Sequence, residues 1–244
     1  MNTAEPPRIT LVLGASRGIG HAICRRLLAA GHRVIGVART FSASGSDHPA
    51  FTPVVLDLSQ LDELAARFQD LLEAHPVIDA VICCAGRGRF GSLEEFSHPQ
   101  IRALMELNFI SHAYAARSFL PAMKRRRRGH LVFIGSEAAL AGRRKGAVYC
   151  ASKFALRGLA QALREECAGS GVHVSIVNPG MVRTDFFDGL DFAPGEEARH
   201  HLLPDDVAAA VQLILDARDG AVIDEINLSP LQKHIVFKKD GGPP

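Results

Sequence analysis

Strand-like apolar runs alternate with helix-like segments along the chain, and this alternation limits its fold more than any other feature. Short apolar runs predict strands centred near residues 11, 35, 55, 81, 132, 175 and 224. Apolar residues at helical spacing predict helices over about 18–30, 59–74, 98–124, 147–168 and 204–217. Strands connected through helices lie parallel, with helices over both faces of the sheet. We therefore predict an α/β fold with a doubly wound parallel sheet of about seven strands and helices on both faces.

The 244 residues (1–244) are predicted to form a single domain with its core at about 8–228, because no linker, repeat or low-complexity tract divides them. The net charge of +2 argues against a nucleic-acid or anionic-membrane partner. No apolar stretch is long enough to span a bilayer, and no leader pattern opens the chain. Five scattered Cys without a C-x-x-C spacing indicate reduced thiols, so we expect a cytoplasmic protein. No metal site is predicted, and His200 and His201 are expected at the surface.

A glycine-rich segment directly follows the first predicted strand and opens the first predicted helix. Gly14, Gly18 and Gly20 have the spacing Gly-x-x-x-Gly-x-Gly. Bare backbone at the start of a helix can approach a pyrophosphate, whose negative charge is favoured by the N–H groups and the helix dipole. The segment therefore predicts a dinucleotide site in a Rossmann-type fold. A tight turn without a ligand is the alternative.

The end of the second predicted strand indicates which dinucleotide is bound. An acidic residue about 20 positions after the glycines would bind a ribose 2′-hydroxyl, whereas an arginine accommodates a 2′-phosphate. Arg39 and Thr40 follow this strand without an acid, and Arg17 lies inside the glycine loop. These residues favour NADP(H), although Arg39 would also suit a solvated turn.

Tyr149 and Lys153 are four residues apart in a predicted helix and therefore share one of its faces. Lowering a tyrosine pKa from ~10 to about 7 takes roughly 4 kcal/mol. One cation about 4 Å away supplies roughly that much at an effective dielectric constant of ~20. The pair thus suits proton transfer to or from a substrate oxygen. Because the spacing also arises by chance, its interpretation depends on the other motifs.

Together these motifs resemble the short-chain dehydrogenase/reductase family, in its short single-domain branch, over about 9–227. In this resemblance Ser136, Tyr149 and Lys153 correspond to the catalytic serine, tyrosine and lysine, and Asn108 to an asparagine that holds a water near the lysine. The residues implied to bind the cofactor are Gly14, Ser16, Arg17, Gly18, Ile19, Gly20, Arg39, Thr40, Asp57, Leu58, Ala85, Gly86, Tyr149, Lys153, Pro179, Gly180, Val182 and Thr184.

Two departures from the family pattern concern structural supports of the cofactor site. Leu13 stands where the family commonly has threonine, and Cys83 and Cys84 replace the usual pair of asparagines. These changes alter local hydrogen bonding but leave the four reacting positions intact.

The resemblance implies an oxidoreductase that interconverts a carbonyl (ketone or aldehyde) and an alcohol with NADP(H). For reduction we expect Ser136 to polarise the carbonyl and Tyr149 to donate the proton. Lys153 is expected to lower the Tyr149 pKa and to hold the nicotinamide ribose, while Asn108 positions a water that connects Lys153 to solvent. Two alternatives stay open: a non-catalytic NADP(H)-binding regulator, and an epimerase or lyase that uses the same Tyr–Lys pair.

The segment at about 185–203 resembles the substrate lid of the family. Its apolar side chains suit a hydrophobic ketone or aldehyde, and packing on the body of the domain is the alternative. Arg143, Arg144 and Lys145 lie near the expected mouth of the site. A solvated loop or a subunit contact is the expected role of these residues; the alternative is that they attract an anionic or carrier-bound substrate such as a 3-oxoacyl thioester. By resemblance we also expect a homodimer or homotetramer, formed through the helices at 98–124 and 147–168.

Overall fold

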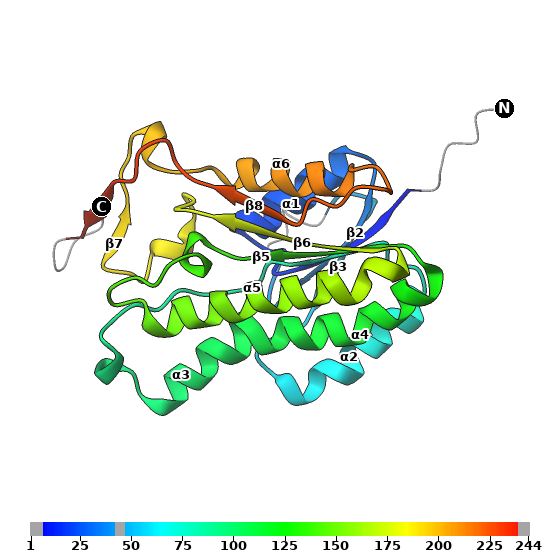
Figure 1. Cartoon of the computed structure of the whole chain (residues 1–244), viewed down its shortest axis with the longest axis horizontal. Helices are drawn as coiled ribbons and strands as arrows, with labels where there is room; N and C mark the ends of the chain where they lie inside the picture. The colour runs from blue at the N-terminus through cyan, green and yellow to red at the C-terminus, as the bar shows by residue number, and fades with distance from the viewer. Residues whose placement is uncertain (1–6, 42–46, 239–244) are drawn as a thin grey trace.

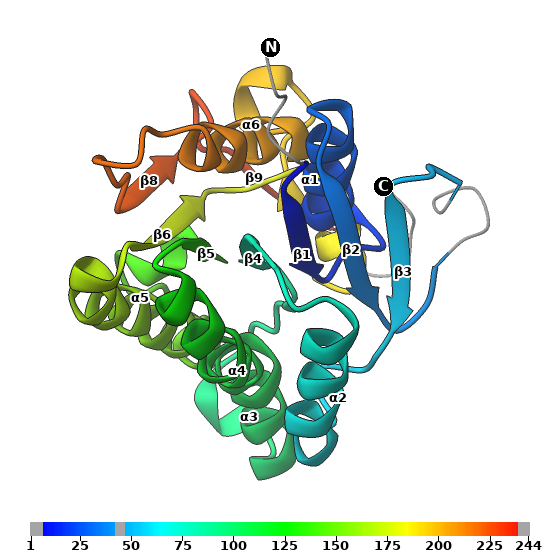
Figure 2. The same cartoon turned by 90° about the vertical axis from the view of Figure 1, so that its right-hand side faces the viewer.

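The computed structural model describes residues 7–41 and 47–238 and confirms the predicted parallel sheet. The strands of this sheet are β1 (Ile9–Leu13), β2 (Arg33–Ala38), β3 (Phe51–Val55), β4 (Ala80–Cys83), β5 (Gly129–Ile134), β6 (Val172–Pro179) and β8 (Glu225–Leu228). They lie in the order β3-β2-β1-β4-β5-β6-β8, and every neighbouring pair is parallel. Figure 1 shows the sheet from its edge, between helices, and Figure 2 shows the order of its strands.

Helices cover both faces of the sheet, as predicted. They are α1 (Gly18–Ala29), α2 (Leu61–Ala74), α3 (His98–Met105), α4 (Ser111–Arg126), α5 (Ala147–Cys167) and α6 (Pro204–Leu215). Helices α1 and α6 lie over one face, and α2, α4 and α5 lie over the other (Figure 2). The inner strands β1, β2, β4, β5 and β6 are therefore buried on both sides, which explains why their apolar residues do not alternate with polar ones, whereas the edge strands β3 and β8 are partly exposed.

The order of the strands explains where a ligand would bind. Successive strands run outward in one direction from β1 to β3, and the chain then returns to place β4 on the opposite side of β1. Loops that follow β1 and β4 consequently leave the sheet in opposite directions and open a crevice between them at the carboxyl edge. The glycine loop follows β1, and the segment 84–88 follows β4.

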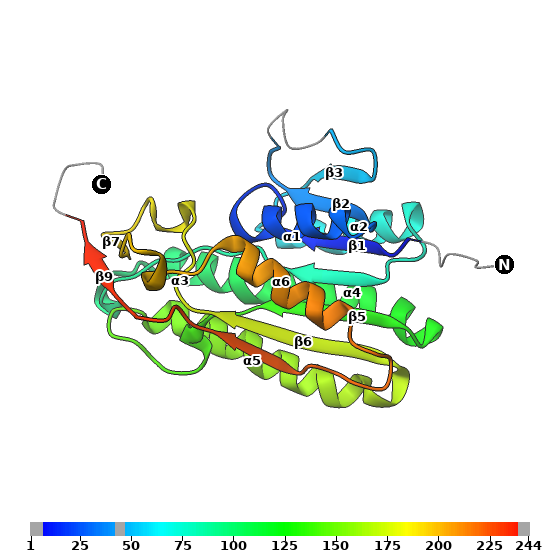
Figure 3. The same ribbon diagram turned by 90° about the horizontal axis from the view of Figure 1, so that it is seen from above.

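Two features of the fold differ from the prediction. The helix expected at 98–124 contains a π-helical segment, Glu106–Ile110, between α3 and α4. A two-stranded antiparallel sheet, not predicted, pairs β7 (Phe192–Pro194) with β9 (Ile235–Phe237), which lies beyond the expected end of the core at 228. Figure 3 shows both strands at the end of the molecule where β5 and β6 end.

The expected exposure of His200 and His201 is wrong, because the two side chains are only 6% and 7% exposed. His201 Nδ1 contacts the carbonyl oxygen of Gly195 at 3.0 Å, and the His200 ring lies 4.7 Å from that of His234, between ring centroids. The segment that follows β7 is thus packed against the C-terminal part of the chain. No helix in the described ranges combines the length and apolar character that a membrane crossing requires.

Candidate active site

A cleft of about 1230 Å³ opens along the carboxyl edge of the sheet, where the predicted site residues gather. Of the residues predicted to bind the cofactor, all except Thr40 line this cleft, and so does Ser136. Thr40 is exposed beyond the end of β2, and Asn108 is fully buried behind the cleft wall.

The glycine loop forms one end of the cleft and has no room for side chains. Gly14 has φ +91°, and a Cβ there would lie 2.8 Å from the main chain of Ala85. A Cβ on Gly20 would lie 1.9 Å from the carbonyl oxygen of Gly14. Helix α1 begins here without a side-chain cap and without an acidic residue in its first turn. Its first N–H groups are therefore available to an anion such as a pyrophosphate.

Positive charge surrounds the same end of the cleft. The exposed side chains of Arg17 and Arg39 both line it, and Asp57 lies near Arg39. Burial opposes ionisation of Asp57, but hydrogen bonds from Ser59 and the charge of Arg39 outweigh burial and lower its pKa. The Ser59 amide and hydroxyl donate to Asp57 Oδ1 at 2.9 and 2.8 Å, which fixes the carboxylate at the cleft wall.

The proposed reacting groups meet at the middle of the cleft. Ser136 follows β5, and Tyr149 and Lys153 lie on one face of α5, 7% and 5% exposed. The Ser136 side chain lies close enough to Tyr149 to lower the pKa of the phenol. Burial raises the pKa of Tyr149 to about 12; the Ser136 side chain opposes this, and Cys150 and Glu137 add to it. The phenol is therefore protonated at neutral pH.

The Lys153 ammonium is hydrogen-bonded to the main chain and not to the phenol of Tyr149. It donates a hydrogen bond to the carbonyl oxygen of Ile134 at 3.0 Å and lies 5.9 Å from the centroid of the tyrosine ring. Burial lowers the pKa of Lys153 to about 8, and the nearby Cys84 partly opposes that shift. The expected lowering of the Tyr149 pKa is absent because desolvation of the phenol dominates in this structure.

The side chain of Asn108 is hydrogen-bonded to the turn that follows β4. Its amide donates to the Arg87 carbonyl oxygen at 3.0 Å, and its Oδ1 accepts from the Arg87 N–H at 3.0 Å. The same amide lies 3.2 Å from Ser152 Oγ, which donates to the Tyr149 carbonyl oxygen at 2.7 Å. Asn108 therefore links the turn to α5, and the π-helical segment is what places it there; such segments are frequent at functional sites.

His112, one turn further along, supports the same turn. Its Nε2 lies 2.7 Å from the carbonyl oxygen of Ala85 and must carry the hydrogen, because a carbonyl only accepts. Cys84 stands where the family pattern has an asparagine, so the turn has no asparagine side-chain amide at this position. Asn108 and His112 thus bond the turn from the helical side. His112 was not predicted from the sequence; a histidine four residues after Asn108 on a helix was the available signal.

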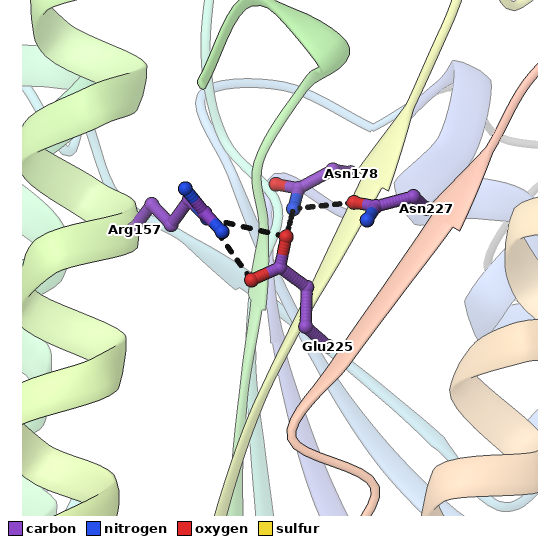
Figure 4. Close-up of polar contacts among 4 residues, drawn as sticks. All are labelled: Arg157, Asn178, Glu225 and Asn227. Atoms are coloured by element: carbon purple, nitrogen blue, oxygen red, sulfur yellow. Dashed lines mark hydrogen bonds and ion pairs between the residues drawn. The ribbon is translucent and has the colours of Figure 1, made fainter. Parts of the chain in front are cut away.

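A polar network two turns further along α5 anchors the helix that carries the tyrosine. Arg157 Nε contacts both carboxylate oxygens of Glu225 on β8, at 3.1 and 2.9 Å. The Asn178 amide on β6 donates to Glu225 at 2.9 Å and to Asn227 at 3.0 Å (Figure 4). Because Tyr149, Lys153 and Arg157 follow one another at four-residue intervals, the network holds in place the face of α5 that carries Tyr149 and Lys153.

Several cleft residues were not predicted as site residues. Phe90 lies 5.1 Å from the Tyr149 ring, between ring centroids, and Glu137 follows Ser136 directly. Three residues of the C-terminal segment also line the cleft: Lys233, Ile235 and Phe237. The β-branched and aromatic run 235–237 was a usable strand signal. In the described part of the chain, no group of His, Cys, Asp and Glu side chains is arranged to hold a metal ion.

Comparison with known proteins identifies the family. The sequence model described as "short chain dehydrogenase" matches residues 8–192. The chain belongs to the short-chain dehydrogenase/reductase family. It is accordingly an oxidoreductase of a family that typically uses a nicotinamide dinucleotide. The bare glycine loop, uncapped α1 and basic cleft end fit the diphosphate and charge of such a cofactor.

Three similar proteins illustrate the relationship. Mouse 17-beta-hydroxysteroid dehydrogenase type 1 is 29% identical over 243 residues, which cover 93% of this short-chain dehydrogenase/reductase and 71% of the mouse protein. The structure of an alcohol dehydrogenase from the archaeon Thermococcus sibiricus, complexed with 5-hydroxy-NADP, has a TM-score of 0.82 and 26% identity, covering 94% and 99% of the two chains. A metagenomic short-chain oxidoreductase in complex with NADP has a TM-score of 0.76 and 32% identity, covering 93% and 98%.

Proposed function

We propose that this chain is an NADP(H)-dependent oxidoreductase that interconverts a ketone or aldehyde with the corresponding alcohol. One observation carries the proposal: a single cleft has Arg17 and Arg39 at one end and Ser136, Tyr149 and Lys153 in its middle. The two arginines suit the phosphates of a dinucleotide, and the serine, tyrosine and lysine suit proton transfer to a carbonyl oxygen.

The preference for the phosphorylated cofactor is supported by charge. Arg39 stands where an acidic residue would select the 2′-hydroxyl of NAD, and Arg17 lies on the same side of the cleft. Two similar solved proteins were crystallised with 5-hydroxy-NADP and with NADP. The residues proposed to hold the cofactor are the glycine loop, Arg39, the Asp57–Leu58 pair, the turn at Ala85 and Gly86, the segment from Pro179 to Thr184, and Lys153.

When bound, the nicotinamide cofactor supplies the hydride that reduces the substrate carbon. The chain's own residues supply the proton and its control. The Ser136 hydroxyl donates a hydrogen bond to the carbonyl oxygen and polarises it. Tyr149, protonated at neutral pH, transfers its phenolic proton to that oxygen, so that the phenol O–H bond breaks and the alcohol O–H bond forms.

The phenolate left after transfer is stabilised by two features of α5. The Lys153 ammonium lies on the same helix face, and Tyr149 stands in the first turn, where the positive end of the helix dipole favours an anion. A water near Asn108 returns the proton from solvent through Lys153. In the oxidising direction, the phenolate accepts the proton of the alcohol, and this proton leaves to solvent by the same route.

A homodimer or homotetramer in the cytoplasm is part of the same proposal. Tyr114 on α4 and Phe154 on α5 are 42% and 43% exposed, which is apolar surface on the two helices expected to pair. Subunit contact would cover it.

The test is a titration with NADPH followed by turnover measurements with a panel of ketones, aldehydes and one 3-oxoacyl thioester. NADPH oxidation that depends on a carbonyl compound is the expected result. Tight NADPH binding without turnover of any compound would favour the regulator, and conversion of a nucleotide sugar without net cofactor oxidation would favour the epimerase. Either outcome would contradict the proposal.

A further inference from the structure

The C-terminal segment is bonded along its length to the lid segment at 185–203. Strand β9 pairs with β7 in antiparallel register, with Phe192 opposite Phe237 and Pro194 opposite Ile235. Beyond β9, the Lys238 N–H donates to the Asp191 carbonyl oxygen at 2.8 Å and its ammonium to that of Phe187 at 2.7 Å. The two segments therefore form one wall.

Alternation along this strand gives it two different faces. Lys233, Ile235 and Phe237 line the cleft. His234 lies on the other side, where its ring is 4.7 Å from that of His200 between centroids. Because side chains alternate between the faces of a strand, Val236 shares the outer face with His234.

Aromatic rings connect this wall with the reacting tyrosine. Ring centroids lie 5.1 Å apart for Tyr149 and Phe90 and 5.0 Å apart for Phe90 and Phe192. Phe192 is in turn the cross-strand partner of Phe237, and such partners lie on the same face of the sheet. The apolar lining is thus continuous from the phenol to the C-terminal strand.

An ion pair ties the strand to the reacting side of the cleft. Lys233 contacts the carboxylate of Glu137, the residue that follows Ser136. The Glu137 side chain is 23% exposed and that of Lys233 is 52% exposed, so solvent partly screens this contact. The contact places the residue before His234 beside the residue that follows Ser136.

Much of the apolar surface on the cleft side of the strand is uncovered. Ile235 is 50% exposed and Phe237 is 71% exposed, although both line a cleft. When a ligand buries apolar side chains that line a site and are otherwise in water, the free energy of the complex is lowered. Aromatic rings would add favourable edge or offset contacts with another ring.

The following inference rests on the proposed function. We propose that Ile235 and Phe237 are specificity-determining residues, and that this enzyme acts on carbonyl compounds with an extended apolar, preferably aromatic, body. The carbonyl group lies at Ser136 and Tyr149, and the body lies along Phe90 and Phe192 to the strand. Small aliphatic carbonyl compounds reach the reacting groups without touching the strand.

The test compares Ile235→Ala and Phe237→Ala with the matched control Val236→Ala. Val236 lies on the outer face of the same strand and is 45% exposed. The probes are naphthyl methyl ketone as the extended aromatic compound and butan-2-one as the small one. Removing either cleft-side residue should raise KM for the naphthyl ketone about tenfold, since burial of a large apolar side chain is lost. KM for butan-2-one, the NADPH dissociation constant and the melting temperature should stay near the wild-type values.

The outcomes separate the two proposals. If the wild-type enzyme binds NADPH but reduces neither ketone nor any other carbonyl compound of the panel, the proposed function fails and takes this inference with it. If the wild-type enzyme is active but Phe237→Ala and Val236→Ala affect the naphthyl ketone equally, the inference alone is overturned. Equal effects accompanied by a change in oligomeric state would assign the strand to a subunit contact instead, and also overturn it.

Discussion

The ammonium of Lys153 donates a hydrogen bond to the main-chain carbonyl oxygen of Ile134, 3.0 Å away, at the end of β5. Ser136 follows two residues later, so this contact joins α5 to the strand that carries the serine. The hydroxyl, phenol and amine are thereby held together by the fold itself. A bound cofactor would find these groups already in place, which lowers the ordering cost of forming the reactive complex.

Arg39 is predicted to discriminate between the two nicotinamide cofactors. Arg39→Ala should weaken NADPH binding by about 10- to 100-fold, since a charge-assisted hydrogen bond contributes roughly 1.5–3 kcal/mol. NADH binding should change little, because NADH lacks the 2′-phosphate. Fluorescence titration with each cofactor measures both constants. Arg33→Ala, at the exposed start of the same strand, is the control; equal losses for NADPH and NADH would contradict the assignment.

Gly20 is predicted to tolerate no side chain. The Cβ of Gly20→Ala would lie 1.9 Å from the Gly14 carbonyl oxygen, so the loop must shift. We expect a loss of stability of about 1–3 kcal/mol and weaker NADPH binding. A methyl group on Gly158 of α5 would meet no atom within 4 Å, and Gly158→Ala should instead stabilise the helix by about 0.5–1 kcal/mol. Denaturant unfolding measures the change in stability of both variants. A Gly20→Ala protein as stable as the wild type would refute the packing argument.

Acid is predicted to destabilise the fold through two histidines whose pKa values are lowered, the buried His112 and the partly buried His130. Burial and the charge of Lys153 lower the pKa of His112 to about 4. Burial lowers the pKa of His130 to about 3, aided by His173 and two nearby arginines. Unfolded histidines titrate near pH ~6.5, so the unfolded chain binds more protons below that value. Stability should be constant above this pH and should fall below it by up to about 1.4 kcal/mol per pH unit for each histidine.

Denaturant unfolding at pH 7.5 and 5 measures this acid dependence. His130→Phe retains a ring beside His173 and removes one titrating group, so its stability should depend less on pH. Wild-type protein that is equally stable at both values would show that the histidines are not held neutral by the fold.

The sequence was sufficient to predict the sheet because its inner strands are buried on both faces and are therefore largely apolar. The predicted site residues converge because turns after parallel strands share one edge of the sheet. The assignment of Arg39 and Tyr149 to cofactor and proton transfer stays a prediction until measured.

Other features depend on contacts that have no local signature. The π-helical segment around Asn108 interrupts a continuous helical pattern, and the buried position of His200 depends on His234, far along the chain. Strand β9 contains only three residues and pairs with an equally short strand. Its alternation is visible in the sequence, but its partner is set by tertiary packing. The direction of the Lys153 ammonium likewise depends on a main-chain carbonyl that the side-chain pattern does not reveal.

The most direct test of the account is single-turnover reduction of a carbonyl substrate by Tyr149→Phe, with NADPH affinity measured in parallel. Removing only the phenolic oxygen should lower the rate of reduction about 10²- to 10⁴-fold, the range for a general acid, while the NADPH dissociation constant stays within a few-fold of wild type. A Tyr149→Phe protein that reduces the substrate at near the wild-type rate would contradict the central claim that this phenol delivers the proton.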